Sequence, residues 1–509
     1  MLIDTFLSVL AGFATDPMSL VLTGIGVVLG LILGAIPGIS STMALAILMP
    51  VTFSMETGPA ILFLISVFVS SIYGGSVSAI LMKIPGTPAS IFTQIEGYPM
   101  ARDGRAGQAL NFSLVASSIG GLIGLALLVV LAPALAGFAT NFRSPEFAAV
   151  ALFGLVMLSF SSNGSTFVAT IVGFLGVLIG MVGFDPLTDA QRFTLNQPIL
   201  QSGIALVPVI IGLFGLGEIL RALSETPETT AIKPVIGKVF VPVRDLISRW
   251  TIMLRGSLIG TFVGAIPAAG SAVAVSIAYA VEKRLSKTPE RFGSGDPDGL
   301  VAPEAANSAG VGGSLIPLIA LGVPGDTITA VLMGALMIHG LQPGPTLFAS
   351  DPTFVSWIYA AVLLALIGTL LFGIVALRFA VLVTRVPPRL MLVFVSVFCV
   401  VGAFAIRNDM NDVYIMAAFG LVGWVFHILN LPPTPLAFGL ILGPILEENV
   451  RRSLMISRGD WLVFLERPVS LAFILFSLAV LILPALIARV RHRAATGTGR
   501  AADSEGHTN

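Results

Sequence analysis

The feature that most constrains this chain is a series of long, predominantly apolar runs that recur along almost its whole length. Examples are Val21 to Ile36, Leu122 to Phe138, Trp357 to Phe379 and Val469 to Ile487. Each is close to the roughly 20 residues that a helix needs to cross the hydrocarbon core of a bilayer. The runs are rich in Gly and Ala and lack the apolar/polar alternation of membrane β-strands. The sequence therefore predicts an all-α polytopic membrane protein with about 10–12 transmembrane helices, some of them broken or re-entrant.

Composition excludes several other classes of protein. Hydrophobic residues make up 56% of the chain and charged residues only 11%, against roughly 25% in soluble domains. The formal net charge is zero, which gives no basic surface for nucleic acid, and Cys399 is the single cysteine. There is no Gly-x-x-x-x-Gly-Lys-Ser/Thr phosphate loop, no Gly-x-Ser-x-Gly elbow and no pair of histidines at metal-ligand spacing. We therefore expect a non-enzyme and assign no catalytic residue, cofactor or metal site.

An internal repeat appears when the chain is compared with itself. Gly30, Gly34, Ala35, Ile36 and Pro37 recur 230 residues later as Gly260, Gly264, Ala265, Ile266 and Pro267. In the same order, Tyr-Gly-Gly-Ser at 73–76 and Pro-Gly-Thr-Pro at 85–88 match Val-Gly-Gly-Ser at 311–314 and Pro-Gly-Asp-Thr at 324–327, with offsets of 238 and 239. Two ordered matches at nearly equal offset predict two related membrane units.

The charges in equivalent loops indicate how the two units are oriented. Lys and Arg concentrate in cytoplasmic loops. The segment 52–59 has no basic residue, whereas its counterpart carries Lys283, Arg284, Lys287 and Arg291. In the next pair of equivalent loops the basic residues lie in the first unit instead, and in the pair after that they lie mainly in the second unit again. This alternation predicts an inverted-topology repeat. The segment 221–255 between the units carries six basic residues and is expected to be cytoplasmic.

These observations define a domain organisation. We expect an N-terminal segment at 1–16, a first membrane repeat at 17–222, a cytoplasmic linker at 223–255, a second membrane repeat at 256–488 and a cytoplasmic tail at 489–509. The stretch 431–467 does not fit the repeat, and Pro432, Pro433 and Pro435 are consistent with a short or re-entrant segment.

Four breaks within apolar runs predict a binding site. Proline lacks an N–H and glycine tolerates positive φ, so Pro-Gly sequences interrupt helices and free backbone groups, which membranes tolerate only beside protein or a water-lined cavity. Each break is followed by Ser or Thr and a new helix, whose N–H groups favour an anion such as a carboxylate. The predicted substrate-binding residues are Pro37, Gly38, Ser40, Ser41, Thr42, Gly75, Ser76, Pro85, Gly86, Thr87, Pro267, Gly270, Ser271, Asn307, Gly313, Pro324, Gly325, Asp326 and Thr327.

Three ionisable residues lie near these breaks, and the role of each can be interpreted in two ways. Glu304 is a candidate contact for a coupling cation or a helix cap at the membrane surface. Asp326 is a candidate cation ligand or an N-cap. Lys83 is a candidate substrate contact or a side chain that extends to the headgroups. We also expect that leucine at Gly86 or Gly325 would fill the space of a bound carboxylate.

At these residues the sequence resembles a known family. The relevant motifs are Gly-Ala-Ile-Pro-Gly at 34–38, Tyr-Gly-Gly-Ser at 73–76, Pro-Gly-Thr-Pro at 85–88, Glu-Gly-Tyr-Pro at 96–99, Glu-Ala-Ala-Asn at 304–307 and Gly-Val-Pro-Gly-Asp at 322–326. They are similar to those of the large membrane subunit of tripartite tricarboxylate transporters, the TctA family. The likeness extends along nearly the full chain, with departures at 267–270 and 307–309.

The resemblance implies a multi-pass protein of the bacterial inner membrane that imports a citrate-like di- or tricarboxylate, driven by a Na⁺ or H⁺ gradient. It also implies two partners, a small four-helix membrane subunit (TctB-like) and a periplasmic substrate-binding protein (TctC-like). The residues alone leave two alternatives open, a passive anion channel and a non-transporting membrane scaffold or enzyme.

Overall fold

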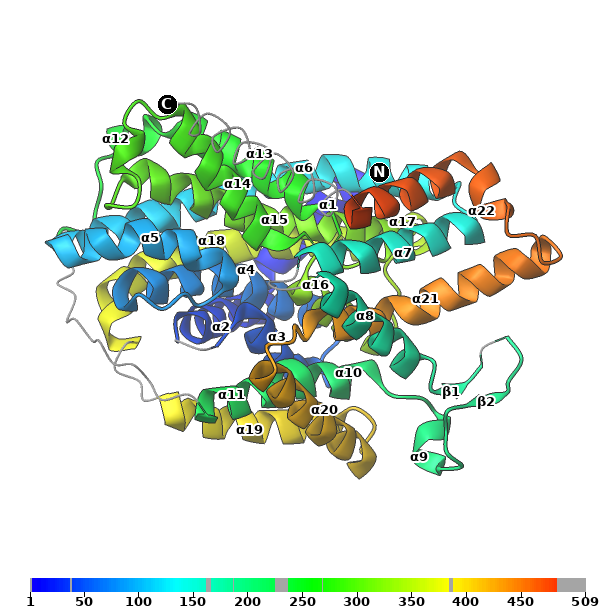
Figure 1. The fold of residues 1–509 in the computed structure, drawn as a ribbon. Helices are drawn as coiled ribbons and strands as arrows, with labels where there is room; N and C mark the ends of the chain where they lie inside the picture. Colours follow the sequence, from blue (N-terminus) through cyan, green and yellow to red (C-terminus); the bar gives the residue numbers. More distant parts are fainter. Residues whose placement is uncertain are drawn as a thin grey trace, which may run out of the picture.

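The structure is a computed structural model that describes residues 2–36, 39–161, 166–185, 187–224, 237–267, 269–383 and 388–482. Over these residues the chain is almost entirely helical, with one two-stranded antiparallel hairpin. Six of the described helices are long and apolar enough to cross a membrane, and seven shorter apolar helices accompany them. The expected all-α polytopic membrane fold is therefore confirmed (Figure 1).

The elements before the basic linker are mostly helices joined by short connections. They are α1 (Leu2–Thr15), α2 (Pro17–Ala35), α3 (Ser41–Leu48), η1 (Met49–Thr52), α4 (Thr57–Met82), η2 (Pro88–Ser90), α5 (Ile91–Met100), η3 (Ala101–Arg105), α6 (Ala106–Ala139), α7 (Ser144–Ser161), α8 (Thr166–Gly180), β1 (Gly183–Phe184), β2 (Gln191–Arg192), α9 (Pro198–Gln201), α10 (Leu206–Ile210), η4 (Ile211–Leu216) and α11 (Gly217–Ser224).

The elements after the linker follow a similar pattern. They are α12 (Val243–Ile247), α13 (Trp250–Gly264), α14 (Gly270–Leu285), η5 (Pro289–Arg291), α15 (Pro297–Leu321), α16 (Thr327–Ile338), α17 (Pro345–Ser350), α18 (Pro352–Val383), α19 (Pro388–Ala405), α20 (Met410–Ile428), α21 (Thr434–Ile456) and α22 (Val463–Glu466). A further apolar helix covers Pro468–Ile482. The stretch that did not fit the repeat thus contains a long helix, α21. The predicted tail at 489–509 lies outside the described residues.

Two helices, α4 and α15, form the centre of the molecule (Figure 1). Every residue is buried from Ala60 to Leu81 in α4 and from Gly299 to Ala320 in α15. Neither stretch contains Lys or Arg, and their ionisable side chains are the carboxyl group of Glu304 and the phenol of Tyr73. Because no lipid reaches these helices, polar groups on them must find partners or cavities inside the protein.

Close contacts of glycine hold the neighbouring helices against this centre. An added Cβ atom at Gly30 of α2 would lie 2.6 Å from the carbonyl oxygen of Val67 in α4. At Gly260 of α13 it would lie 2.2 Å from that of Ala306 in α15. The same pattern is repeated one turn to either side, where Gly26 and Gly34 face Phe63 and Ser71, and Gly256 and Gly264 face Ala302 and Gly310. Small residues at such spacing allow membrane helices to approach closely.

The helices end and restart at the four segments where breaks were expected. The gaps lie between α2 and α3, between α4 and η2, between α13 and α14, and between α15 and α16. Lys83 (φ 58°) and Gly322 (φ 72°), which are 239 residues apart, end α4 and α15 in the same left-handed conformation. This conformation turns the chain sharply away from the helix axis.

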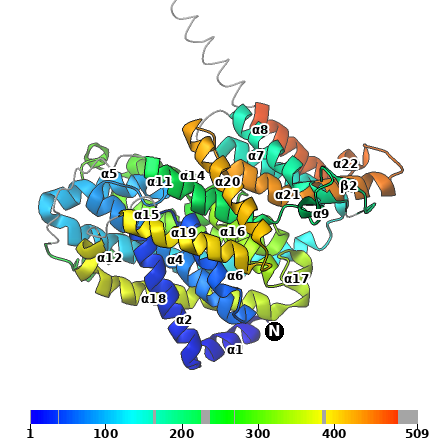
Figure 2. The ribbon, with the colours of Figure 1, turned by 90° about the horizontal axis from the view of Figure 1, so that it is seen from below.

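The β1–β2 hairpin and α9 lie beside α21 at one end of the molecule (Figures 1 and 2). Charged side chains hold the hairpin to α21. The Arg451 Nη1 atom lies 2.5 Å from Asp185 Oδ2, and Arg192 pairs with Glu447. This end of α21 is therefore anchored while its other end, at Thr434, reaches the interior.

Candidate functional site

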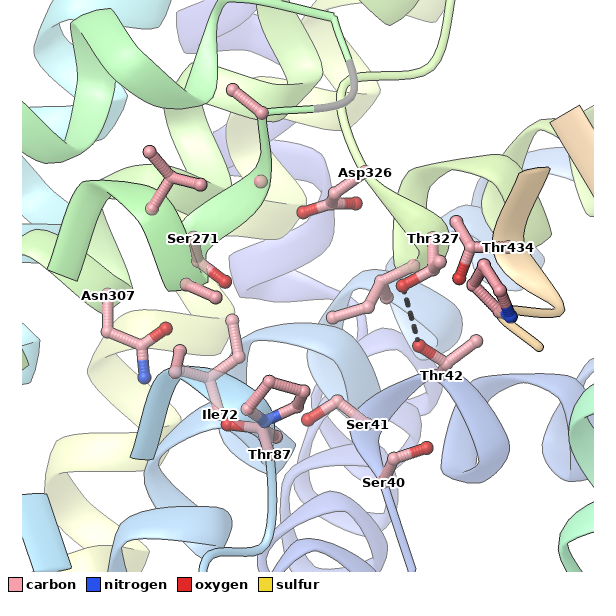
Figure 3. A pocket seen from close by; sticks show the side chains of 18 of the residues that line it. Ser40, Ser41, Thr42, Ile72, Thr87, Ser271, Asn307, Asp326, Thr327 and Thr434 are labelled. Carbon is pink, nitrogen blue, oxygen red and sulfur yellow. Dashed lines mark hydrogen bonds between the residues drawn. The ribbon is translucent and has the colours of Figure 1, made fainter. Parts of the chain in front are cut away.

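A cavity of about 560 Å³ lies where the helix breaks meet. This volume is within the range of about 300–1,000 Å³ that is usual for small-molecule sites. Its wall comes from five separate parts of the chain and from two central helices: residues 40–42, 87–89, 269–273 with Ser276, 326–328 and 430–434, together with Ile72 of α4 and Asn307 of α15. All four predicted breaks thus contribute residues to the same space (Figure 3).

Helix N-termini surround this cavity. Ser40 caps α3 by accepting the Met43 N–H at 3.2 Å, and Asp326 caps α16 by accepting the Thr329 N–H at 2.8 Å. Gly270 begins α14 with φ of 68°, a conformation that glycine adopts without strain. Thr434 begins α21. Since the N-terminus of a helix carries partial positive charge, the arrangement favours an anionic ligand.

Two buried polar groups in the wall have no hydrogen-bond partner in the described part of the chain, namely Ser41 Oγ and Asn307 Nδ2. Their side chains are only 1% and 2% exposed. Buried polar atoms in native proteins are almost always bonded, and an unsatisfied one costs about 1–3 kcal/mol. Both residues line the cavity (Figure 3), so a ligand with acceptor oxygens would supply the missing partners.

The two halves of the chain touch directly at this wall. Thr42 Oγ1, at the start of α3, lies 3.1 Å from Thr327 Oγ1, at the start of α16 (Figure 3). Among the described residues that line the cavity, Asp326 is the one with an ionisable side chain, and none is Lys or Arg. An anion would thus be held by neutral hydroxyl, amide and backbone donors.

Asp326 acts as an N-cap in this structure, which is one of the two roles that the sequence suggested for it. Its Oδ1 atom accepts the backbone N–H and the hydroxyl of Thr329, both at 2.8 Å, and its own N–H donates to Thr329 Oγ1 at 2.9 Å. This capping box accounts for the residue without a bound cation, although the side chain also lines the cavity.

Glu304 lies outside the cavity, one helical turn before Asn307 on α15. Its side chain is fully buried, with 0% exposure. Ser76 and Thr93 donate to Oε1, and Ser113 and Ser117 donate to Oε2. The reading of Glu304 as a cap at the membrane surface is therefore wrong, because the carboxylate sits at the crossing of four helices rather than at a helix start.

The predicted site residues divide into three groups. Ser40, Ser41, Thr42, Thr87, Gly270, Ser271, Asn307, Asp326 and Thr327 line the cavity. Gly75, Ser76, Pro85, Gly86, Pro267, Gly313, Pro324 and Gly325 do not belong to the lining. Pro37 and Gly38 lie outside the described residues. Lys83 is also outside the lining: it is exposed and its Nζ lies 5.7 Å from the centre of the Tyr98 ring.

The expectation that leucine at Gly86 or Gly325 would fill ligand space is wrong. A Cβ atom on Gly86 would lie 2.5 Å from the Cα atom of Gly75, and one on Gly325 would lie 2.6 Å from that of Ser314. Both glycines thus face α4 or α15 and let the broken segment pack against the central helix. Their place in the fold is helix packing beside the cavity.

Sequence reasoning missed a part of the wall. The loop from Asn430 to Thr434 contributes five consecutive residues, and Ile72, Pro88, Ala89 and Ser276 also belong to the lining. The closely spaced prolines at 432, 433 and 435 were the available signal, because proline begins helices and ends apolar runs. They have no counterpart in the repeat, so comparison of the two halves could not assign them.

Comparisons with known proteins identify one family and two relatives. Residues 20–438 match the family model described as "Tripartite tricarboxylate transporter TctA family". An uncharacterized 52.8 kDa protein in the TAR-I ttuC′ 3′ region of Agrobacterium vitis is 34% identical over 495 residues, which cover 97% of this chain and 98% of that protein. A second uncharacterized protein of that organism, in the TAR-II ttuC′ 3′ region, is 34% identical over 46% of this chain and 96% of its own length. No solved structure matches the chain.

Proposed function

Since the chain belongs to the tripartite tricarboxylate transporter TctA family, we propose that it carries a citrate-like di- or tricarboxylate across the bacterial inner membrane through the cavity of Figure 3. The family is one of transporters, and the apolar helices make the chain a multi-pass membrane protein. The substrate class, the use of an ion gradient and the inner membrane are parts of the proposal.

The observation that carries the proposal is the pair of buried donors without partners, Ser41 Oγ and Asn307 Nδ2, in a wall made of helix N-termini. A carboxylate offers two acceptor oxygens, and two or three carboxylates on one small molecule can reach several helix starts at once. Discontinuous helices whose N-termini point at anionic groups are a known construction of substrate sites in secondary transporters.

The same family membership supports two partners. The family description is of a tripartite system, and we propose that a small four-helix membrane subunit and a periplasmic substrate-binding protein complete it. Transport would then draw on a Na⁺ or H⁺ gradient rather than on ATP. A periplasmic protein would deliver the carboxylate, and this chain would release it on the cytoplasmic side.

An inverted repeat is also part of the proposal. The glycine contacts of α2 with α4 and of α13 with α15 support a repeat, because their residues correspond at constant offsets of 230 and 239. The opposite charge bias of equivalent loops supports the inverted orientation of its two units. Two units of opposite orientation that share one cavity allow alternating access, since one unit can rock against the other around a fixed site.

Transport assays in liposomes test the proposal. The full chain, reconstituted with its periplasmic partner, should take up labelled citrate or another member of a panel of di- and tricarboxylates. Uptake should saturate and should collapse when the Na⁺ and pH gradients are removed. Uptake that persists without any gradient, or single-channel currents in a planar bilayer, would show a passive anion channel instead. A purified protein that binds no carboxylate would favour a scaffold or an enzyme.

A further inference from the structure

The carboxylate of Glu304 is surrounded by hydroxyl groups from three other helices. Ser76 of α4 lies 2.7 Å from Oε1, and Ser113 and Ser117 of α6 lie 2.8 and 2.9 Å from Oε2. Thr93 of α5 completes the group, which we call the hydroxyl cage. None of these donors carries a charge. A negative charge inside a membrane protein is costly unless it is neutralised, and such residues usually have a function.

Four other buried acids in the described part of the chain have an arginine partner. Glu146, Asp185, Glu282 and Asp412 pair with Arg467, Arg451, Arg255 and Arg407 respectively. Their charge is balanced within the protein. Among the described residues Glu304 has no such partner, and its four hydrogen bonds all come from hydroxyls.

Glu96 provides an informative contrast, since it too is fully buried and has no ion pair. It accepts the backbone N–H groups of Gly293, Gly295 and Asp296, together with the Tyr279 hydroxyl. A backbone N–H can only donate, so the backbone partners of Glu96 can bond only to an acceptor oxygen. A hydroxyl can donate or accept by rotating. The cage of Glu304 can therefore satisfy both the carboxylate and the neutral carboxylic acid without any backbone movement.

A row of hydroxyls leads from the cavity toward Glu304. Thr87 lines the cavity, and its Oγ1 atom lies 2.9 Å from Ser90 Oγ. Ser90 is fully buried, and Thr93, three residues further along, donates to Glu304. Residues spaced by three share one face of a helix. The spacing of 87, 90 and 93 thus provides hydroxyls along one side of η2 and α5, between the cavity and the cage.

The helices of the cage are also helices of the cavity wall. Asn307, in the wall, follows Glu304 by three residues on α15, and Ser76, in the cage, follows the wall residue Ile72 by four residues on α4. A ligand that shifts either helix would change the distances in the cage. A proton on Glu304 would in turn change the charge felt in the cavity.

We propose that Glu304 is a proton-binding site coupled to the anion site, an inference that rests on the proposed function. The carboxylate takes one proton from cavity water, becomes a neutral carboxylic acid, and returns that proton to water when the cavity opens on the other side. One caging hydroxyl rotates from donor to acceptor in the neutral state. One proton then accompanies each substrate anion.

The surroundings of Glu304 hold few other groups that could take up this proton. Tyr73 of α4 is the titratable neighbour that interacts with it electrostatically, and its hydroxyl lies 3.3 Å from the Leu110 carbonyl oxygen. Several ionisable groups on or beside helices packed against α15 have partners of their own: Glu96 of α5 with the 293–296 loop and Tyr279, Arg255 of α13 with Glu282 of α14, Arg249 with Asp298, and Asp326 with Thr329. The others on these helices are Lys283 and Arg284 of α14, which are exposed, and Tyr98 of α5, whose ring centre lies 5.7 Å from Lys83 Nζ. Helices α6, α16 and α17 contain no ionisable residue.

Infrared spectroscopy of the full chain tests proton binding without a substrate. As the pH is lowered, the wild type should gain the C=O stretching band of a buried carboxylic acid, and Glu304→Gln should lose that band. Ser76→Ala should shift it, since one hydrogen bond is removed. Ser66→Ala is the matched control, because this buried α4 serine bonds only to its own helix, at Leu62 O, and should leave the band unchanged. A titrating band that is identical in Glu304→Gln would overturn the proposal.

Transport assays separate this inference from the proposed function. In liposomes, counterflow of labelled against unlabelled citrate requires no gradient, whereas accumulation driven by an inward pH gradient requires proton coupling. Glu304→Gln should retain counterflow and lose accumulation. Accumulation at the wild-type level would overturn the proton site, and loss of both activities would assign Glu304 a structural role only. A wild type with neither activity and no carboxylate binding would contradict the proposed function itself, whatever the infrared result.

Discussion

At the scale of single residues, the cavity differs from the rest of the interior because polar groups in its wall are left without partners. The buried serines of α4 nearby show the usual solution: Ser66 and Ser70 donate to carbonyl oxygens of their own helix, at 2.7 and 2.6 Å. Ser41 and Asn307 do not find such partners among the described residues. Their unused hydrogen-bonding capacity is the residue-level reason to place a ligand here.

This difference predicts the effect of Asn307→Ala. The free protein loses no hydrogen bond through Nδ2, whereas the complex loses one, worth about 1 kcal/mol. The dissociation constant for the carboxylate should rise about fivefold, while the melting temperature should stay at or near the wild-type value. Isothermal titration and thermal unfolding in detergent measure the two quantities.

Asn111→Ala is the matched control. Asn111 is also buried, at 5% exposure, but its Oδ1 atom accepts the Val241 N–H at 3.4 Å and it lies outside the cavity. Its replacement should lower the melting temperature and leave carboxylate affinity unchanged. If Asn307→Ala destabilised the protein as much and bound carboxylate as tightly as the wild type, Asn307 would be a packing residue.

At the scale of elements, the broken helices depend on glycines that pack against α4 and α15. Gly86 follows the left-handed turn at Lys83, and its N–H lies 3.3 Å from the Gly75 carbonyl oxygen. Gly325 occupies the corresponding place beside Ser314. Because the backbone of each broken segment touches a central helix, the following helix start is brought to the cavity.

Gly86→Ala should therefore destabilise the protein. The new methyl group would meet the Gly75 Cα atom at 2.5 Å and the Gly34 oxygen at 2.8 Å, and such overpacking typically costs about 1–3 kcal/mol. The melting temperature should fall. Gly137→Ala is the control: this glycine of α6 has no atom within 4 Å of an added Cβ, and alanine favours helices. Equal melting temperatures for the two variants would contradict the packing role of Gly86.

At the scale of the whole molecule, the cavity exists because the two halves of the chain meet. Residues 40–42 and 87–89 come from the first half, and 269–273, 326–328 and 430–434 come from the second. The contact between Thr42 and Thr327 joins segments 285 residues apart. A change in the relative position of the halves would open or close the cavity on this side.

A cysteine pair tests that contact. In a Cys399→Ala background, which removes the single native cysteine, Thr42→Cys with Thr327→Cys should form a disulfide under mild oxidation, because the native hydroxyl oxygens are 3.1 Å apart. The cross-link should block carboxylate uptake, and a reductant should restore it. Mass spectrometry detects the bond, and Thr42→Cys alone is the control. Absence of the cross-link would show that the two helix starts do not meet.

Much of the fold could be predicted from local sequence properties. Hydropathy identified the membrane helices, and Pro-Gly segments identified the places where they stop, since these depend on the side chains and backbone freedom of a few adjacent residues. The four breaks were expected to lie near one another only because of the predicted repeat. The residues predicted to bind substrate include Ser41 and Asn307, which line the cavity, and Gly86 and Gly325, which do not.

By itself, then, the sequence determined that the chain is a helical membrane protein and where its helices break, because apolar length and Pro-Gly spacing act locally. Its motifs also determined which family it resembles. Only the tertiary structure decided which polar groups face the cavity and which face another helix, that the loop at 430–434 completes the wall, and that Glu304 lies within hydroxyls of three helices. Those outcomes depend on contacts between residues hundreds of positions apart, and no local pattern specifies the rotation of one helix against another.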